Sequence, residues 1–158
     1  MKRKPLDRMD CSIAKALDIV GDPWTMLILR DALLGVQRFE SFSTRLGIPR
    51  ATLSARLDHL CDRGVLEPRP YQERPERVEY VLTSKGRALR PVVVTLMQWG
   101  DQWVRDDDPP TTIVDTATGA VVDPVLVDRG SGTPLDDMRL RARGRVTSGL
   151  DRPTDAAL

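Results

Sequence analysis

The sequence has little of the chemistry that enzymes and metal sites need. Its 158 residues include one histidine and two cysteines, too few for a four-ligand Cys/His zinc site within one chain. His59 and Cys61 lie two positions apart on a predicted helix, so they face different directions and do not form a nucleophilic pair. The chain also lacks a P-loop and a dinucleotide-binding glycine loop. We therefore expect no enzymatic activity, no cofactor and no metal.

Long apolar runs are missing as well. No segment approaches the roughly 18 consecutive apolar residues that a membrane helix needs. The basic residues of Met1–Pro5 are followed by no apolar signal core. We therefore expect a cytoplasmic protein without membrane contact. The hydrophobic fraction of 41% is sufficient for a buried core, and the length fits one domain with an appendage.

The net charge is +1, but it is unevenly distributed. Residues 1–105 hold 18 Lys and Arg against 13 Asp and Glu, a net +5, whereas residues 106–158 hold 6 against 10, a net −4. The basic part of the chain is therefore the part that could bind a polyanion.

The most informative segment is 47–86. Leu53, Leu57 and Leu60 repeat at spacings of four and three, so they share one face of a helix that Gly64 can end. Proline at 49 is acceptable in a first helical turn. The predicted helix covers residues 50–63, and its remaining surface carries Arg50, Thr52, Ser54, Ala55 and Arg56.

A β-hairpin is predicted directly after this helix. Pro68 and Pro70 exclude a helix there, and Val78, Tyr80 and Leu82 recur at the period of a strand. A helix with outward arginines followed by a basic hairpin can place the helix in a DNA major groove and the hairpin on the backbone. Each feature alone is ordinary, but their order indicates a winged helix. The turn between the strands, residues 72–77, carries Arg74 and Arg77.

Three short helices are predicted before this segment. Ser12 is the expected N-cap of the first, and Asp22 and Pro23 are expected to begin the second. The third ends at Gly47 and forms a helix-turn-helix with the helix over 50–63. The expected apolar faces are Ile13, Ala16, Leu17 and Val20 in the first helix, Trp24, Leu27, Ile28 and Leu34 in the second, and Phe39, Phe42 and Leu46 in the third.

A longer helix is predicted over residues 84–105. Its apolar residues recur at an average spacing of 3.5, which is typical of a helix–helix seam: Leu89, Val92, Leu96, Trp99 and Trp103. Tryptophan is common in protein interfaces, so we expect this seam to form a homodimer interface. The alternative is packing onto its own domain. Pro91 should kink the helix unless the helix starts later.

For the rest of the chain we expect a linker at residues 106–110, a small β unit at 111–146 and a loose tail at 147–158. A loose basic tail is also expected at residues 1–10. Short apolar runs at 111–114, 120–122, 125–127 and 138–140 are separated by glycine and proline. Four arginines alternate and should line one exposed strand face: Arg139, Arg141, Arg143 and Arg145.

The chain resembles the HxlR family of bacterial winged helix-turn-helix regulators over Cys11 to Val104. The resemblance rests on Cys11, which opens the first helix, and on the segments 20–24, 27–30, 38–39, 53–57 and 64–66. Its most specific motif is RVEYVLTSKG at residues 77–86.

The resemblance implies an α+β fold, with a winged helix-turn-helix domain at 11–105, a long dimerisation helix and a small C-terminal β unit. It implies a homodimeric regulator that binds inverted repeats in double-stranded DNA, and we expect a repressor rather than an activator. The first and last helices of the domain would build the dimer. The alternative is a winged helix that binds a protein partner. By position, the DNA-binding residues would be Arg50, Thr52, Ser54, Ala55, Arg56, Arg74 and Arg77.

Two further expectations concern the signal. Some relatives sense oxidants or electrophiles through a cysteine at the position of Cys11, where a helix N-terminus and Lys15 would favour the reactive thiolate. The alternative role of Cys11 is that of a small buried residue at the dimer seam. The alternative effector is a small apolar molecule bound near Trp24, Trp99 or Trp103. Cys61 is expected to pack inside.

Many relatives carry a tail that resembles a zinc ribbon with a C-x-x-C-G turn. The matching turn here is 128–132, in which Asp128 and Ser131 replace the thiolates. Neither supplies the sulfur ligand of such a site, so we expect a metal-free remnant.

Overall fold

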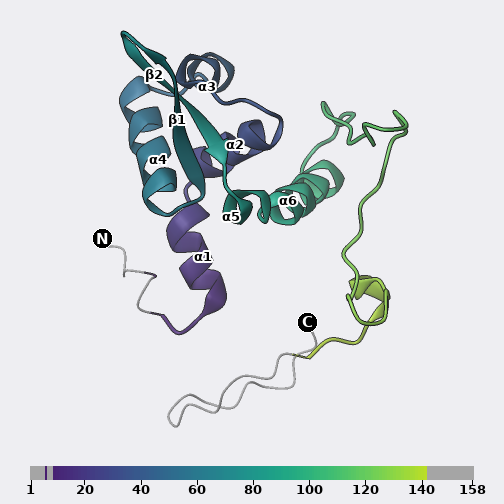
Figure 1. Cartoon of the computed structure of the whole chain (residues 1–158). Helices are drawn as coiled ribbons and strands as arrows, with labels where there is room; N and C mark the ends of the chain where they lie inside the picture. Colours follow the sequence, from purple (N-terminus) through teal and green to yellow (C-terminus); the bar gives the residue numbers. More distant parts are fainter. Residues whose placement is uncertain (1–5, 7–8, 142–158) are drawn as a thin grey trace. The chain divides into compact units, whose positions relative to one another are not determined.

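The computed structural model describes residue 6 and residues 9–141, which form two units that meet between Asp106 and Asp107. Most of the expected basic tail, the expected C-terminal tail, Arg143 and Arg145 lie outside the described residues. The first unit (Figure 1) contains α1 (Ser12–Val20), α2 (Pro23–Leu33), α3 (Phe39–Leu46), α4 (Arg50–Asp62), β1 (Leu66–Glu73), β2 (Glu76–Leu82), α5 (Ser84–Arg87) and α6 (Arg90–Trp103).

Local signals set most helix ends. The Asp22 side chain caps α2 by accepting a hydrogen bond from the Thr25 amide at 3.2 Å, as predicted. Gly47 ends α3 with φ +60°, a conformation that suits glycine. One predicted start differs by one residue, because Cys11 rather than Ser12 is the N-cap of α1. Helix α4 begins at Arg50 as predicted, with Pro49 as its N-cap.

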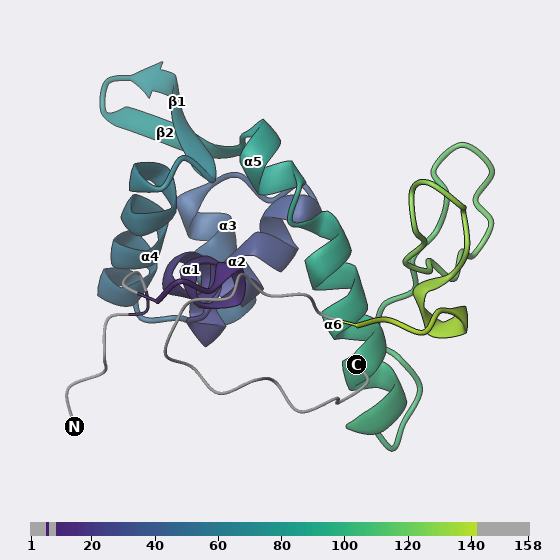
Figure 2. The ribbon, with the colours of Figure 1, turned by 90° about the horizontal axis from the view of Figure 1, so that it is seen from below.

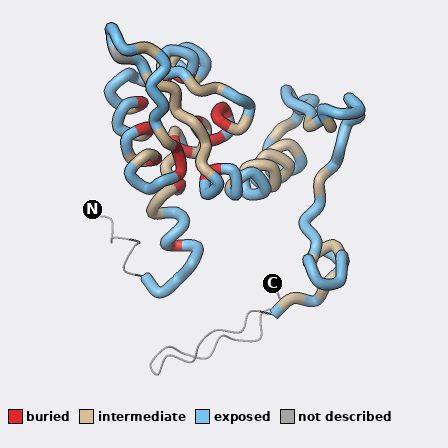
Figure 3. Tube along the Cα trace, viewed as in Figure 1, coloured by how far each residue is buried: buried red, intermediate tan, exposed pale blue. Residues whose placement is uncertain are grey.

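The core lies where α2, α3 and α4 meet the base of the hairpin. Figure 3 shows the buried positions concentrated there and none in α6. Part of the expected apolar faces is not buried: Ile13, Ala16 and Leu17 of α1 and Leu34 after α2 are exposed. The apolar core cluster comprises Val20, Ile28, Leu29, Ala32, Phe42, Ile48, Leu53, Leu57, Leu60, Val65 and Leu66.

The hairpin is an antiparallel pair, with Leu66 opposite Leu82 at its base and a turn at residues 74–75, which is tighter than predicted. A third extended segment joins it just before α3. Arg38 forms a β-bridge with Glu79, and the neighbouring Tyr80 amide donates a hydrogen bond to the Gln37 carbonyl at 2.7 Å. This third segment fixes the hairpin to the helix-turn-helix.

The long helix expected over residues 84–105 is two helices. Thr83 caps α5, accepting a hydrogen bond from the Gly86 amide at 3.1 Å. Gly86 is buried against the Val65 carbonyl, where a Cβ would collide. Pro91 then lies in the first turn of α6, so the later start that we allowed for is the observed one. In both views α4 and α6 lie on opposite sides of the domain, with α1–α3 between them (Figures 1 and 2).

The second unit contains two turns of the same design. Asp115 and Asp128, thirteen residues apart, each begin a D-x-x-[S/T]-G sequence that ends in a glycine with φ +71°. The Asp115 carboxylate accepts hydrogen bonds from the Ala117 amide at 3.0 Å and the Thr118 hydroxyl at 2.8 Å. The Asp128 carboxylate accepts them from the Ser131 amide at 2.7 Å and its hydroxyl at 2.9 Å. Sequence analysis identified only the second turn.

The strands expected in this unit are mostly wrong. In the described part of the chain they reduce to two isolated β-bridges, between Val114 and Val121 and between Val127 and Pro134. The expected strand at 138–140 forms no bridge there and follows a short 3-10 helix, Leu135–Asp137. Hydrogen bonds within the two turns hold the backbone where longer strand ladders were expected.

Candidate nucleic-acid interface

The second helix of the helix-turn-helix, α4, has a sharply divided surface. Leu53, Leu57 and Leu60 are fully buried, as the spacing predicts. The opposite side of its N-terminal half is exposed and consists of small or polar groups, with Thr52 half-buried at its edge. This surface can approach another molecule closely. Its exposed residues are Arg50, Ala51, Ser54 and Ala55.

Arg56 does not share that outward direction. Its guanidinium forms an ion pair with Asp22 at 3.0 Å, and only 36% of its side chain is exposed. Arg56 lies next to Leu57 on the helix, so it flanks the buried face and reaches the N-cap of α2. Arg56 was expected to face the groove. In the structure its ion pair with Asp22 instead joins α4 to α2.

Arg50 is exposed but tightly held. Its two terminal nitrogens each donate to one carboxylate oxygen of Glu40, both at 2.7 Å. The guanidinium also lies over the Phe39 ring, 4.7 Å from the centroid. The hydrogen bonds from Arg50 hold the pKa of Glu40 below its usual value, and the charges of Arg50 and Arg77 add to this lowering. Glu40 therefore links the starts of α3 and α4 electrostatically to the hairpin.

The hairpin presents two exposed arginines, Arg74 in the turn and Arg77 in β2. Its middle is braced by Arg38, which bonds Glu79 at 2.9 Å and lies 4.6 Å from the centroid of the Tyr71 ring. Sequence analysis missed this brace because the partners are far apart in the chain. The brace holds the hairpin beside α3 and α4 (Figure 1).

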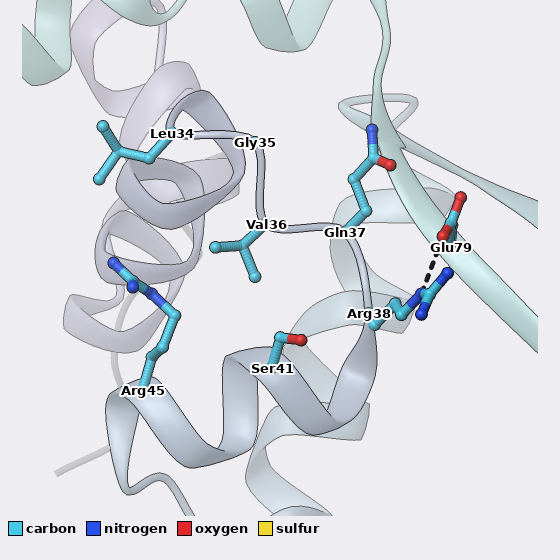
Figure 4. Close-up of a pocket in the computed structure, with 8 residues that line it drawn as sticks. All are labelled: Leu34, Gly35, Val36, Gln37, Arg38, Ser41, Arg45 and Glu79. Carbon is cyan, nitrogen blue, oxygen red and sulfur yellow. Dashed lines mark hydrogen bonds and ion pairs between the residues drawn. The ribbon is translucent and has the colours of Figure 1, made fainter.

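A shallow hollow opens between α2, α3 and the hairpin base (Figure 4). Its two arginines already have acidic partners: Arg38 pairs with Glu79, and Arg45 pairs with the fully buried Asp31 at 3.1 Å. The hollow therefore offers little net charge to a ligand, and the tryptophans expected around an effector do not line it. Its lining is Leu34, Gly35, Val36, Gln37, Arg38, Ser41, Arg45 and Glu79.

The cysteines and the histidine have different surroundings. Cys11 is exposed at the N-cap of α1, whereas Cys61 is half-buried. Burial, with the charges of Asp58 and Asp62, raises the pKa of the Cys61 thiol, which reduces the fraction of this thiol present as the reactive thiolate. His59 Nε2 lies 3.2 Å from the Ile19 carbonyl and so joins α4 to α1.

A second exposed surface is apolar. Val92, Leu96, Trp99 and Trp103 of α6 are all about half exposed or more, and α6 has no buried residue. Leu89 was predicted to lie in the homodimer interface, but it packs against the core. Two residues of the predicted apolar stripe of α1, Ile13 and Leu17, are likewise exposed, at 70% and 48%.

Residues 6 and 9–141, which the structure describes, contain neither a membrane-spanning helix nor a cluster of metal ligands. None of their helices has the length and apolar character needed to cross a membrane. Within the same residues, no group of three or more His, Cys, Asp or Glu side chains could hold a metal ion.

The helix-turn-helix, the exposed face of α4 and the braced hairpin define a winged helix-turn-helix protein. The chain belongs to the HxlR-like helix-turn-helix family, whose family model matches residues 19–108. It is similar to the uncharacterised HTH-type transcriptional regulator MT3179 of Mycobacterium tuberculosis (strain CDC 1551 / Oshkosh). The two are 46% identical over 117 residues, which cover 73% of this chain and 74% of MT3179.

Solved structures agree with this assignment. PA1607, a proposed transcription factor, has a TM-score of 0.76 at 36% identity and covers 89% of this chain and 100% of its own. The redox regulator HypR in its reduced form has a TM-score of 0.55 at 29% identity, covering 58% of this chain and 92% of its own. The protein is therefore a transcriptional regulator of the helix-turn-helix type and not an enzyme.

Proposed function

We propose that this protein is a homodimeric repressor that binds an inverted repeat in double-stranded DNA. The observation that carries the proposal is the separation of its two exposed surfaces. Helix α4 and the hairpin lie on one side of the domain, and α6 lies on the other (Figure 2). The exposed residues of α4 are polar or small, and those of α6 include large apolar side chains. A dimer built through α6 would leave both α4 helices free for DNA.

The groups on the α4 surface fit the edges of bases. Arginine can donate two hydrogen bonds to guanine O6 and N7, which suits Arg50. Ser54 and Thr52 can hydrogen-bond to bases or phosphates, and the Ala55 methyl can contact a thymine methyl. Arg56 supports this surface indirectly through its ion pair with α2. Beside it, Arg74 and Arg77 of the hairpin suit phosphate contacts.

The proposed dimer interface combines α6 with α1. Val92, Leu96, Trp99 and Trp103 form its main apolar surface, and Ile13 and Leu17 extend it. A twofold interface of this kind presents two identical reading helices, which is why an inverted repeat is expected. The two half-sites should then lie about 10–10.5 base pairs apart, or a multiple of that.

Cys11 is the proposed point of regulation. Its thiol is exposed, and Cys11 is the N-cap of α1, the helix that carries Ile13 and Leu17. An oxidised side chain there would change how α1 packs in the dimer and so change the spacing of the two α4 helices. The similarity to the redox regulator HypR supports this role.

Selection from a random duplex library with the full-length protein tests the proposal. We expect enrichment of a palindromic sequence, and Arg74→Ala and Arg77→Ala should each weaken binding to it and lower the salt slope by about 1. Arg63→Ala is the matched control, because Arg63 lies at the far end of α4 and pairs with Asp18. No enrichment, with retained dimerisation, would favour a protein-binding module and contradict the proposal.

A further inference from the structure

The Arg50–Glu40 pair has an unusual position for a surface ion pair. It joins the first residue of α4 to the second residue of α3, so it lies at the end of the helix that would enter DNA. A carboxylate on such a surface repels phosphates, and by itself it weakens binding to any DNA. An acidic group in this position therefore needs a role that offsets this cost.

The geometry of the pair supplies that role. Both carboxylate oxygens are used at 2.7 Å, and the guanidinium is stacked on Phe39 at 4.7 Å. Isolated surface pairs are usually weak, but a two-bond fork with a stacked ring restricts the arginine to one orientation. The charge of Arg77 also contributes to the lowered pKa of Glu40.

From this arrangement we infer that Glu40 is a positioning residue that sets the ratio of specific to non-specific DNA affinity by holding Arg50. The inference rests on the proposed function. Glu40 neutralises Arg50 and keeps it from forming random phosphate contacts. The bonds to Glu40 use the terminal edge of the guanidinium, and its Nε edge points elsewhere. That edge can still donate to guanine O6 and N7.

The test compares wild type and Glu40→Gln on two duplexes, the sequence enriched by selection and a scrambled version, across a salt series. Without the carboxylate charge, Arg50 becomes free to bind phosphates. Binding to scrambled DNA should tighten several-fold, with a salt slope steeper by about 0.9. Binding to the enriched duplex should not tighten, so the affinity ratio should fall by the same several-fold factor, within the discrimination that one two-bond base contact provides.

A double-mutant cycle shows whether Glu40 acts through its partner. In an Arg50→Ala background Glu40→Gln should leave the affinity ratio unchanged, because loss of the carboxylate's repulsion acts on both duplexes alike and no arginine remains to be released. The control is Asp18→Asn, which breaks the Arg63 pair at the other end of α4 and should leave the affinity ratio unchanged. Both carboxylates are exposed or half-exposed, and circular dichroism will confirm that each variant folds.

The outcomes separate the inference from the function on which it rests. If wild type prefers the enriched duplex but Glu40→Gln changes both affinities equally, the inference is wrong and the proposed function stands. A Glu40→Gln effect on the affinity ratio that persists without Arg50 also overturns it, because Glu40 would then set the ratio without its partner. If wild type shows no preference between the duplexes, the proposed function fails and the inference fails with it.

Discussion

Replacing Trp99 by alanine should break the proposed dimer without unfolding the protomer. Trp99 is 57% exposed in the single chain, so its removal leaves no cavity in the core. A tryptophan has about 250 Å² of surface, of which roughly 140 Å² would be available to a partner. At about 25 cal/mol per Å², complete coverage stabilises the dimer by about 3.5 kcal/mol per protomer as an upper bound.

Two symmetric copies of the substitution therefore remove at most about 7 kcal/mol from the dimer. The actual loss is smaller, because alanine retains part of the contact and the partner covers Trp99 only partly. We therefore expect a loss of about 3 kcal/mol, which raises the dimer dissociation constant roughly a hundredfold. Sedimentation velocity over a concentration series measures this change directly. The thermal unfolding of the monomeric fraction should remain close to that of wild type.

The matched control is Tyr71→Ala. Tyr71 is an aromatic residue, 41% exposed, on the hairpin across the domain from α6 (Figure 2). It should not change the dimer dissociation constant. Two results would refute the reasoning: a wild type that stays monomeric at micromolar concentration, or a Trp99→Ala variant that dimerises as tightly as wild type.

Three other predictions concern the core, the second unit and the signal. Arg45→Ala leaves the buried Asp31 carboxylate with one guanidinium fewer and should cost about 1–2 kcal/mol in urea unfolding; Arg45→Lys should cost less, and an unchanged midpoint would contradict the role of this pair. Hydrogen bonds from the Ser131 amide and hydroxyl lower the pKa of Asp128. Because the pKa of Asp128 is lower in the folded state, its carboxylate stabilises the turn at pH values above its ordinary pKa of 3.8. This contribution is lost as the pH falls through the folded-state pKa. Ser131→Ala should move the pKa of Asp128 toward 3.8 in a carboxyl NMR titration, and no movement would mean that the hydroxyl contributes nothing. Hydrogen peroxide should change the DNA affinity of wild type and not of Cys11→Ser, whereas an equal response would exclude Cys11 as the sensor.

Local patterns in the sequence predicted the helix-turn-helix and the hairpin well. The Leu53, Leu57 and Leu60 spacing gave the buried face of α4, and Asp22 and Gly47 gave helix ends, because caps and periodicity depend on neighbouring residues. RVEYVLTSKG identified the family because it records a strand, a cap and a helix start together. These features needed no knowledge of the tertiary structure.

The remaining errors have tertiary causes. An apolar helix stripe shows that a face is covered, but not by what, so the stripe did not show that Ile13 and Leu17 would be exposed in the single chain. The Glu40–Arg50 fork joins two helices, and no spacing rule relates the two positions. Arg56 was assigned to the groove because its position at the edge of the buried face was not considered. The turn at Asp115 could have been found by searching for a second D-x-x-[S/T]-G sequence.

The most direct test of the central claim is fluorescence anisotropy on the DNA immediately upstream of the protein's own gene and on the enriched duplex. Scrambled DNA serves as the reference, and each duplex is titrated across a salt series. We expect tight, salt-sensitive binding to the enriched duplex. The negative charge that Ala55→Glu introduces should abolish this binding while the dimer persists. Equal affinity for enriched and scrambled DNA, or full affinity in Ala55→Glu, would contradict the claim that α4 reads DNA.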